Sequence, residues 1–283
     1  MPCYHPLVAI KTGNADKPVK VFGSFEKFSK DIDSLPRYVD IGSGEYYEPF
    51  KIPCGKCIGC RLDYSREWAD RCVMESLEYP EEFSCWVTLT YSDENLRFGD
   101  KDNATLIKDD LSGFMKRLRE RYSRIYNHQG IRFYGCGEYG DRSGRPHYHV
   151  ILFNCPLFNK RIIGHTASGF PLYNSDDFDS VWPYGHAVIA NFNWDTAAYT
   201  ARYVLKKHKG PDSRFFYDDN GILPEFVLMS RRPGIAYKYY TDNADKIYKY
   251  DEIVLPAIGD KAHIVKPGLR DIKTNSGKIP LSS

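Results

Sequence analysis

The sequence lacks any long apolar segment, has little excess of either charge, and contains few cysteines for its length. No run of apolar residues approaches the roughly 18 that a membrane-spanning helix needs, so a membrane span is excluded. The 39 basic and 37 acidic residues give a formal net charge of +2, which does not by itself indicate a nucleic-acid-binding protein. Eight cysteines among 283 residues are too few for a disulfide scaffold.

Other absences narrow the class of protein further. The chain has no internal repeat and no low-complexity block, and its 42% hydrophobic and 27% charged residues are typical of a folded protein of one or two domains. Residues 1–17 contain no apolar core of a secretion signal. We therefore expect the cysteines to be reduced thiols or metal ligands.

Hydrophobic periodicity predicts the elements in the middle of the chain, whereas residues 1–53 show no sustained period and are expected to be irregular. The predicted hairpin of strands 131–136 and 147–153 favours an α+β fold with an antiparallel sheet and helices on one face. The predicted helices span residues 61–79, 109–124 and 195–209, the last with Asp195 as its N-cap, and the predicted strands span residues 86–91, 131–136, 147–153 and 186–192.

His147 and His149 lie two residues apart on a predicted strand. Because side chains alternate across a strand, both imidazoles are expected on one face. Glu138 is the natural third ligand, since the hairpin would return the chain beside it. Two imidazoles and one carboxylate suit a divalent ion with open positions for substrate; Mg²⁺ or Mn²⁺ fits phosphate chemistry, and ligand type does not exclude Zn²⁺. The alternative is two histidines that alternate by chance in an amphipathic strand.

Tyr199 and Tyr203 lie four residues apart on the last predicted helix, and therefore on one face. Lys206 and Lys207 follow Tyr203 by three and four residues and can share that face. A tyrosine becomes a useful nucleophile when cations or a metal favour the phenolate, and Arg202 with the two lysines could do this or hold a DNA phosphate. The alternative is a pair of aromatic core residues at helical spacing.

The chain presents, in one order, the apolar strand WVTLTY, the His-Tyr-His strand, and a tyrosine followed after three residues by a lysine. This combination resembles the motifs of the HUH endonucleases that start rolling-circle replication. The YxxxY spacing is similar to that of the two-tyrosine initiators of small single-stranded DNA phages. The segments MPCYHP, PCGKCIGCR and MSRRPGI also look like those of gokushovirus-type microvirus initiators, so the resemblance covers residues 1 to about 240.

The resemblance implies an antiparallel ferredoxin- or RRM-like HUH endonuclease sheet flanked by helices, with an N-terminal cysteine-rich metal-binding segment. It implies a site-specific single-stranded DNA nickase and ligase with a 5′-phosphotyrosine intermediate. The implied partners are origin DNA and the host polymerase and helicase, in the cytoplasm of the bacterial host and with no membrane. The implied site comprises the metal ligands Glu138, His147 and His149 and the catalytic residues Tyr199, Tyr203 and Lys206.

Cys54, Cys57 and Cys60 form a dense cluster with two residues between successive cysteines. Cys3 could complete a four-sulfur zinc site, with His5 as a substitute. An iron–sulfur cluster uses similar spacing, and unliganded thiols near a turn are a further alternative. We favour structural zinc, which would tie the N-terminus to the first predicted helix. The remaining cysteines, which we expect to be small buried residues, are Cys72, Cys85, Cys136 and Cys155.

Basic residues gather locally even though the overall charge is balanced. Arg145 flanks the predicted metal hairpin, and Arg202 and Lys207 lie on the tyrosine helix, so we expect these three to contact DNA. The charged face of residues 116–124 is expected to be merely solvated. The expected domains are an N-terminal segment 1–60, an endonuclease domain 61–215, and a C-terminal extension 216–283 that packs on the core and ends in a flexible tail.

Two other functions are compatible with these residues. A non-catalytic module that binds single-stranded nucleic acid on a ferredoxin-like sheet would explain the aromatic and basic residues, but it needs neither the histidine pair nor the tyrosine pair. A metal-dependent phosphodiesterase would use water as its nucleophile. A covalent protein–DNA adduct would distinguish the nickase from both.

Overall fold

The computed structural model describes residues 3–11, 19–28, 38–39, 46–47, 49–202, 212–250, 253–255 and 263–265. The chain forms two compact units, residues 1–65 and 66–283, and the boundary between them falls within helix α2 (Ile58–Ser76). None of the described helices combines the length and the hydropathy that crossing a bilayer would require.

The first unit contains a small antiparallel sheet in which strand β1 lies between β2 and β5. The prediction that residues 1–53 are irregular is wrong. The periodic pattern was missing because three successive residues of β1, Val8 to Ile10, are buried, and because the pairing of β1 with β2 shifts register between Val8 and Ala9, which leaves Phe22 of β2 as an extra residue. The elements of this unit are β1 (Leu7–Lys11), β2 (Val19–Ser24), α1 (Phe25–Phe28), β3 (Tyr38–Val39), β4 (Tyr46–Tyr47) and β5 (Phe50–Ile52).

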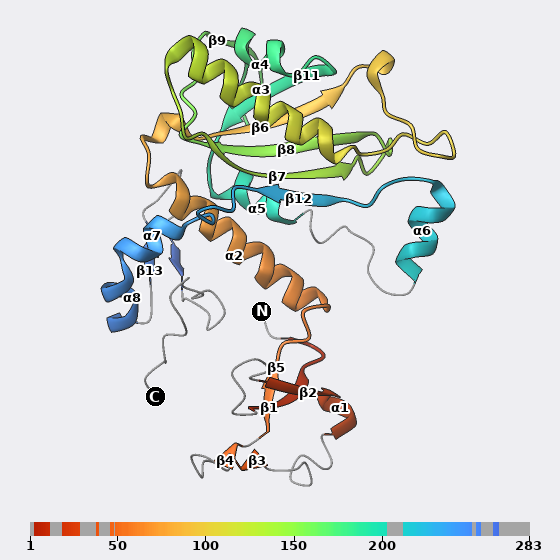
Figure 1. The fold of residues 1–283 in the computed structure, drawn as a ribbon, viewed down its shortest axis with the longest axis vertical. Helices are drawn as coiled ribbons and strands as arrows, with labels where there is room; N and C mark the ends of the chain where they lie inside the picture. Colours follow the sequence, from red (N-terminus) through yellow and green to blue (C-terminus); the bar gives the residue numbers. More distant parts are fainter. Residues whose placement is uncertain are drawn as a thin grey trace. The chain divides into compact units, whose positions relative to one another are not determined.

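The second unit is built on a seven-stranded antiparallel sheet with the order β12-β7-β8-β6-β11-β10-β9 (Figure 1). The four predicted strands are confirmed as β6, β7, β8 and β11. The other three strands of this sheet, β9, β10 and β12, were not predicted. The strands are β6 (Cys85–Tyr91), β7 (Arg132–Tyr139), β8 (Pro146–Phe153), β9 (Lys160–His165), β10 (Pro171–Ser175), β11 (Gly185–Asn191) and β12 (Phe226–Met229).

Helices cover both faces of this sheet (Figure 1), so the prediction of helices on one face is wrong. Helices α3 (Lys108–Tyr126) and α4 (Asp176–Val181) pack on one face, and α5 (Trp194–Arg202) packs on the other together with residues 69–74 of α2. The second layer has a physical basis that the hairpin pattern alone did not include: the last residues of β8 are apolar on both faces, with Val150 in the α3 core and Ile151 in the α5 core.

Alternation along β6 decides which side chains face each helical layer. Val87 and Leu89 are fully buried beneath α3, whereas Trp86, Thr88 and Thr90 are half-buried on the opposite face. The polar residues of the sheet therefore collect on the α5 face.

Helix α3 is confirmed by its buried stripe, which includes Leu111, Phe114, Met115 and Leu118. It ends where Asn127 takes the left-handed conformation with φ of 50°. The remaining described elements are the short 3₁₀ helices η2 (Glu81–Phe83) and η3 (Asp93–Asn95), helices α6 (Asp212–Asn220), α7 (Tyr237–Asp242) and α8 (Ala244–Tyr250), and strands β13 (Ile253–Leu255) and β14 (His263–Val265).

Candidate functional site

The register of the β7–β8 hairpin brings the three predicted metal ligands onto one face. Glu138 of β7 lies opposite His147 of β8, and His149 lies two residues further along β8 on the same face. One ligand atom from each of the three residues lies within 4.8 Å of the other two. The structure therefore brings together the group predicted from the sequence, and these residues could hold a metal ion.

Both histidines direct Nε2 at the same carboxylate oxygen. His147 Nε2 lies 2.7 Å and His149 Nε2 3.4 Å from Glu138 Oε1. Glu138 and His149 are buried, and His147 is partly exposed. The three donors thus converge on one point at the surface of the α5 face.

The other nitrogen of each ring is anchored by the protein. His147 Nδ1 lies 3.1 Å from the carbonyl oxygen of Arg145, and His149 Nδ1 lies 3.1 Å from Thr88 Oγ1. Because a carbonyl only accepts, Nδ1 of His147 carries the hydrogen, and a neutral ring would then direct its Nε2 lone pair at the carboxylate. A lone pair on His147 Nε2 and the Glu138 carboxylate oxygen repel each other, so a positive charge must lie between them, either a proton on the ring or a metal ion. Histidines anchored through the other ring nitrogen are typical of metal sites.

The environment of Glu138 also fits a cation. Although burial raises its pKa, hydrogen bonds with His147 and His149 outweigh this and hold the pKa of Glu138 below its usual value. Within the described part of the chain, Glu138 Oε2 is buried and has no hydrogen-bond partner. A buried carboxylate with one unsatisfied oxygen beside two imidazole nitrogens has the donor set of a divalent metal site.

Helix α5 begins one residue earlier than predicted and is capped by a different residue. The Asn193 carbonyl accepts the first helical hydrogen bond from Ala197, and Asn193 Oδ1 accepts the Thr196 N–H at 2.8 Å. Asn193 is therefore the N-cap, and the prediction of Asp195 is wrong. Asp195 instead lies in the first turn, where its charge suits the helix dipole.

Tyr199 lies on α5 against the three residues Glu138, His147 and His149, which are called the metal group below. Its ring centroid is 5.3 Å from that of His149 and 5.8 Å from that of Trp86, edge-on to both. Tyr199 is 43% exposed, so it lies at the protein surface beside this group. Tyr203, Lys206 and Lys207, the other predicted residues of this helix, lie outside the described residues.

Trp86 joins the metal group to the tyrosine helix, and the sequence analysis missed it. Its ring stacks on His149 at a centroid distance of 4.8 Å and an interplanar angle of 12°. Its Nε1–H donates to Thr200 Oγ1 on α5 at 2.9 Å, and that hydroxyl donates to Thr196 O. The alternation of WVTLTY placed Trp86 on the face of Thr88, which was the available signal.

The predicted DNA-binding arginines have different surroundings. Arg202 is exposed at the last residue of α5, three residues after Tyr199. The Arg145 guanidinium lies 2.6 Å from Asp93 Oδ1 and donates to the Tyr91 carbonyl at 2.7 Å. Arg145 therefore links the β7–β8 turn to the end of β6, while its side chain stays partly exposed.

The expectation of a solvated charged face on α3 is wrong for Arg117 and Arg121, which are partly buried, whereas Arg119 is exposed as expected although it also bonds a neighbouring segment. Arg117 Nε donates to the Val181 carbonyl at 2.8 Å, and Arg119 Nε donates to the Ile131 carbonyl at 3.0 Å. Arg121 Nε lies 2.6 Å from the buried carboxylate of Asp177. These arginines fasten α3 to neighbouring segments instead of facing solvent alone.

In the first unit, Cys3, Cys54, Cys57 and Cys60 place their sulfurs within 4.8 Å of one another and could hold a metal ion. Cys60 lies in the first turn of α2, and Cys57 directly precedes that helix. Several backbone N–H groups donate to the sulfurs, including that of Cys57 to Cys54 Sγ at 3.3 Å. His5, the proposed substitute ligand, instead lies 3.5 Å from Glu26.

The thiols of this cluster differ in acidity. The Cys60 N–H lowers the pKa of Cys57 to about 6, and N–H donors from Cys57 and Lys56 lower the pKa of Cys54 although burial raises it. Burial and the neighbouring Cys3 sulfur raise the pKa of Cys60 to about 12. Four sulfurs this close cannot all be thiolates without a cation among them, which fits a four-sulfur metal site.

The other cysteines match the expectation of small buried residues, and all eight cysteines of the chain are free thiols in the described part. Each of the four is at most 1% exposed, and they belong to the sheet and helix layers of the second unit. They are Cys72, Cys85, Cys136 and Cys155.

Comparison with known proteins gives a consistent set of relatives. The family described as replication-associated protein ORF2/G2P matches residues 84–208, a segment that contains the metal group and Tyr199. The chain is 34% identical over 255 residues to the replication-associated protein ORF2 of Spiroplasma virus 4, which covers 90% of this chain and 74% of that protein.

Two further relatives come from other phages. The chain is 33% identical over 210 residues to the replication-associated protein VP4 of Bdellovibrio phage phiMH2K, covering 73% of this chain and 58% of that protein. It is 32% identical over 162 residues to the replication-associated protein ORF4 of Chlamydia phage 1, covering 56% of this chain and 39% of that protein. No solved structure matches the chain.

Proposed function

Since this chain belongs to the replication-associated proteins of microvirus-type phages, we propose that it starts rolling-circle replication by nicking and rejoining single-stranded DNA. The observation that carries the proposal is the contact between the Tyr199 ring and His149, a member of the Glu138–His147–His149 group. A tyrosine, two imidazoles and a carboxylate on one face provide a nucleophile beside a metal-binding donor set.

The topology of the second unit supports an HUH-type endonuclease with a ferredoxin-like sheet. Its four central strands have the order β11-β6-β8-β7, and α3 connects β6 to β7. This is the strand order of a ferredoxin-like βαββαβ sheet. The His-Tyr-His strand then occupies a central position between β7 and β6, where both neighbours can orient its histidines.

We propose Mg²⁺ or Mn²⁺ as the ion at this group. When bound, the ion would polarise the scissile phosphate and stabilise the charge that develops on it. Thr88 and the Arg145 carbonyl hold the two histidine rings in orientation through Nδ1, which leaves Nε2 for the metal.

The proposed reaction is a transesterification. The Tyr199 hydroxyl oxygen attacks the phosphorus, its proton leaves, and a bond forms between the tyrosine oxygen and the 5′-phosphate as the bond to the 3′ oxygen breaks. The departing 3′ oxygen takes up a proton and becomes the 3′-hydroxyl from which a host polymerase extends, with a host helicase opening the duplex. One phosphodiester replaces another, so no ATP is needed.

Tyr203 is proposed to attack the regenerated origin after one round, and the 3′-hydroxyl released by that attack would displace Tyr199 and close the circle. Lys206 is proposed to stabilise the phenolate, and Arg202, Lys207 and Arg145 to hold DNA phosphates. In the first unit we propose structural zinc at the cysteine cluster.

The full chain should be incubated with single-stranded phage origin DNA and Mn²⁺, and the covalent adduct then mapped by peptide mass spectrometry. We expect the adduct on Tyr199 or Tyr203, its loss in the double variant Tyr199→Phe with Tyr203→Phe, and its loss on chelation. Tyr237→Phe removes an equally exposed tyrosine on α7 and serves as the matched control. An adduct that persists in the double variant, or binding of DNA without any adduct, would contradict the proposal.

A further inference from the structure

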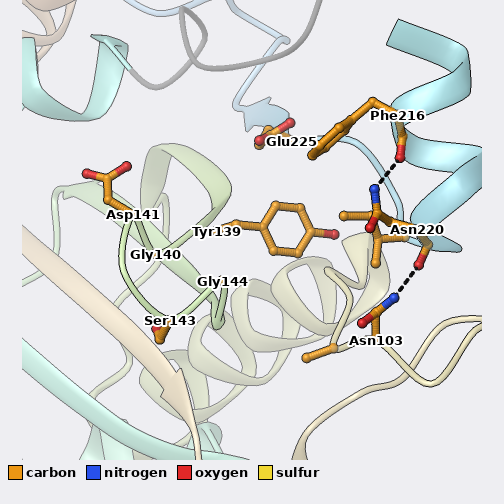
Figure 2. Close-up of a pocket in the computed structure, with 11 residues that line it drawn as sticks. Asn103, Tyr139, Gly140, Asp141, Ser143, Gly144, Phe216, Asn220 and Glu225 are labelled. Atoms are coloured by element: carbon orange, nitrogen blue, oxygen red, sulfur yellow. Dashed lines mark hydrogen bonds between the residues drawn. The ribbon is translucent and has the colours of Figure 1, made fainter.

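The two faces of the sheet in the second unit offer different surroundings to a DNA strand. Figure 2 shows a pocket of about 550 Å³ between the β7–β8 turn and α6, lined in part by Tyr139. Tyr139 packs against the α3 core, whereas Glu138, its neighbour in β7, belongs to the metal group on the opposite, α5 face. The residues that can share a substrate with the metal group are therefore those of the α5 face.

A row of directly opposed residues crosses the α5 face from β7 to β11. Glu138 of β7 lies opposite His147 of β8. His147 in turn lies opposite Thr90 of β6, and Thr90 lies opposite His186 of β11. Opposed residues of an antiparallel sheet point to the same face, and Ala187, which follows His186, is buried in the α3 core. His186 therefore lies on the α5 face, and two strand spacings of about 4.8 Å separate its backbone from that of His147.

The residues of this row become more exposed from β7 towards β11. Glu138 is buried, His147 and Thr90 are half-buried, and His186 is exposed. Helix α5 covers the same face nearer the other end of these strands, where it packs on Trp86. The described residues therefore leave the metal group accessible from the β11 side, across the short side chain of Thr90.

The start of β11 is held closely against β6. The Thr90 hydroxyl donates to the His186 carbonyl at 3.4 Å, and the Ser92 N–H donates to the Tyr184 carbonyl at 2.8 Å. A Cβ at Gly185 would lie 2.2 Å from the Thr90 carbonyl oxygen, so this approach requires glycine. These contacts fix the backbone of His186, while its ring has no hydrogen-bond or ion-pair partner within the described part of the chain.

We propose that His186 binds the DNA phosphate next to the scissile one, through a hydrogen bond from its ring. The proposal rests on the function proposed above, in which the metal group holds the scissile phosphate. A neutral imidazole carries one N–H donor and a charged one carries two, so the ring can donate to a phosphate oxygen in either state. Because the backbone of His186 is fixed relative to β8, this contact would set the register of the DNA strand at the metal group.

The test uses the full chain and single-stranded phage origin oligomers in which one phosphate at a time is replaced by an uncharged methylphosphonate. Fluorescence anisotropy at fixed salt, without added divalent ion, measures the affinity. His186→Ala should bind the unmodified oligomer about tenfold more weakly, near the lower limit for a hydrogen bond to a charged group. At one position, the methylphosphonate should weaken binding of the native protein about tenfold and that of His186→Ala by less than about twofold.

Two variants and a metal titration serve as controls. His186→Gln keeps an N–H donor and should recover most of the lost affinity. His165→Ala removes an exposed histidine of the edge strand β9 and should leave DNA binding unchanged. Mn²⁺ binding should be the same in His186→Ala as in the native protein, because His186 is not one of the three residues whose ligand atoms lie within 4.8 Å of one another.

The same methylphosphonate profile in the native and His186→Ala proteins, or an equal loss of affinity in His165→Ala, would overturn the proposal. An affected phosphate that does not neighbour the nicking position, as mapped from the adduct, would overturn it as well. Binding to these oligomers needs no strand cleavage, so the two proposals fail separately. An adduct with an unchanged profile refutes the His186 contact alone, and a position-specific loss without any adduct refutes the nicking chemistry alone.

Discussion

The cysteine cluster of the first unit takes its sulfurs from two separate chain segments and the start of a helix, whereas the Glu138–His147–His149 group takes its side chains from two paired strands. The cysteine sulfurs lie as close as 3.8 Å to one another and accept backbone N–H groups, two of which join distant segments: Tyr4 N–H donates to Cys57 Sγ and Cys54 N–H donates to Cys3 Sγ. The histidines are positioned by β7 and β6 on either side of β8.

This difference predicts that a metal at the first site would matter for folding and a metal at the second for the proposed chemistry. The described part of the first unit has a small sheet and few buried residues, so a metal at the cysteines would supply much of its stability. The second unit has a large core on both faces of its sheet, which keeps the strands in register whether or not a metal is bound. Loss of metal should therefore unfold the first unit and only inactivate the second.

The largest effect is expected from removal of the metal proposed at the cysteine cluster. Structural zinc contributes about 10–16 kcal/mol in small zinc domains, which equals or exceeds the total stability of about 5–15 kcal/mol of a typical domain. Chelation, or Cys54→Ser with Cys57→Ser, should abolish hydrogen-exchange protection in β1 and β5 and leave β6 and β8 protected. His5→Ala is the matched control, since His5 pairs with Glu26. Unchanged protection in the first unit would refute a structural metal.

The next largest effect is expected from Glu138→Gln, which keeps the shape of the side chain and removes its charge. Loss of a direct ligand should reduce the rate of adduct formation by about 1,000-fold or more. Loss of a residue that only hydrogen-bonds to a ligand already reduces metal affinity or activity by about 10–100-fold. Hydrogen-exchange protection of β7 and β8 should not change. Single-turnover kinetics measure the rate, hydrogen exchange measures the protection, and Mn²⁺ titration by electron paramagnetic resonance measures the accompanying loss of metal binding. Unfolding of the sheet would contradict the expectation that the core keeps its strands in register without a metal.

A smaller effect is expected when Trp86 no longer links the Glu138–His147–His149 group to helix α5. Trp86→Leu removes both the stack on His149 and the hydrogen bond to Thr200. A misplacement of about 1 Å can cost about 100-fold in rate, so adduct formation should fall by that order. Mn²⁺ affinity should change by less than about tenfold, because no ligand is lost. Thr200→Val breaks the same hydrogen bond from the α5 side, and an unchanged rate in both variants would exclude this link.

The smallest effect is expected from Thr88→Val, which removes the hydroxyl beside His149 Nδ1. Loss of such an anchor weakens metal binding about 10–100-fold, and we expect the lower end because the ring also stacks on Trp86. Thr88→Ser keeps the hydroxyl and should bind Mn²⁺ as the native protein does. Equal Mn²⁺ affinity in the valine and native proteins would show that strand pairing alone orients His149.

The sequence predicted those parts of the second unit whose pattern is local. The stripe of α3 and the alternation of β6 and β8 identified the elements, and the hairpin placed Glu138 beside His147. The cap of α5 was misplaced, because Asn193 and Asp195 are both good caps and only the backbone decides between them.

Long-range pairing explains what the sequence could not provide. That Thr88 lies opposite His149 depends on the register of β6 with β8, two strands separated by more than fifty residues. The stack of Trp86 on His149 depends on the same register. Tyr203, Lys206 and Lys207 lie outside the described residues, so their roles stay predictions.

The indole of Trp86 lies nearly parallel to the His149 ring and edge-on to Tyr199. Fluorescence of an indole this close to a paramagnetic ion is quenched, so Mn²⁺ loading should be visible in the unlabelled protein as a loss of emission. Linkage of Tyr199 to DNA would alter the same emission a second time. Trp86 is one of four tryptophans, so its emission is the part that Trp86→Leu removes, and in that part metal loading and strand transfer would be read in sequence.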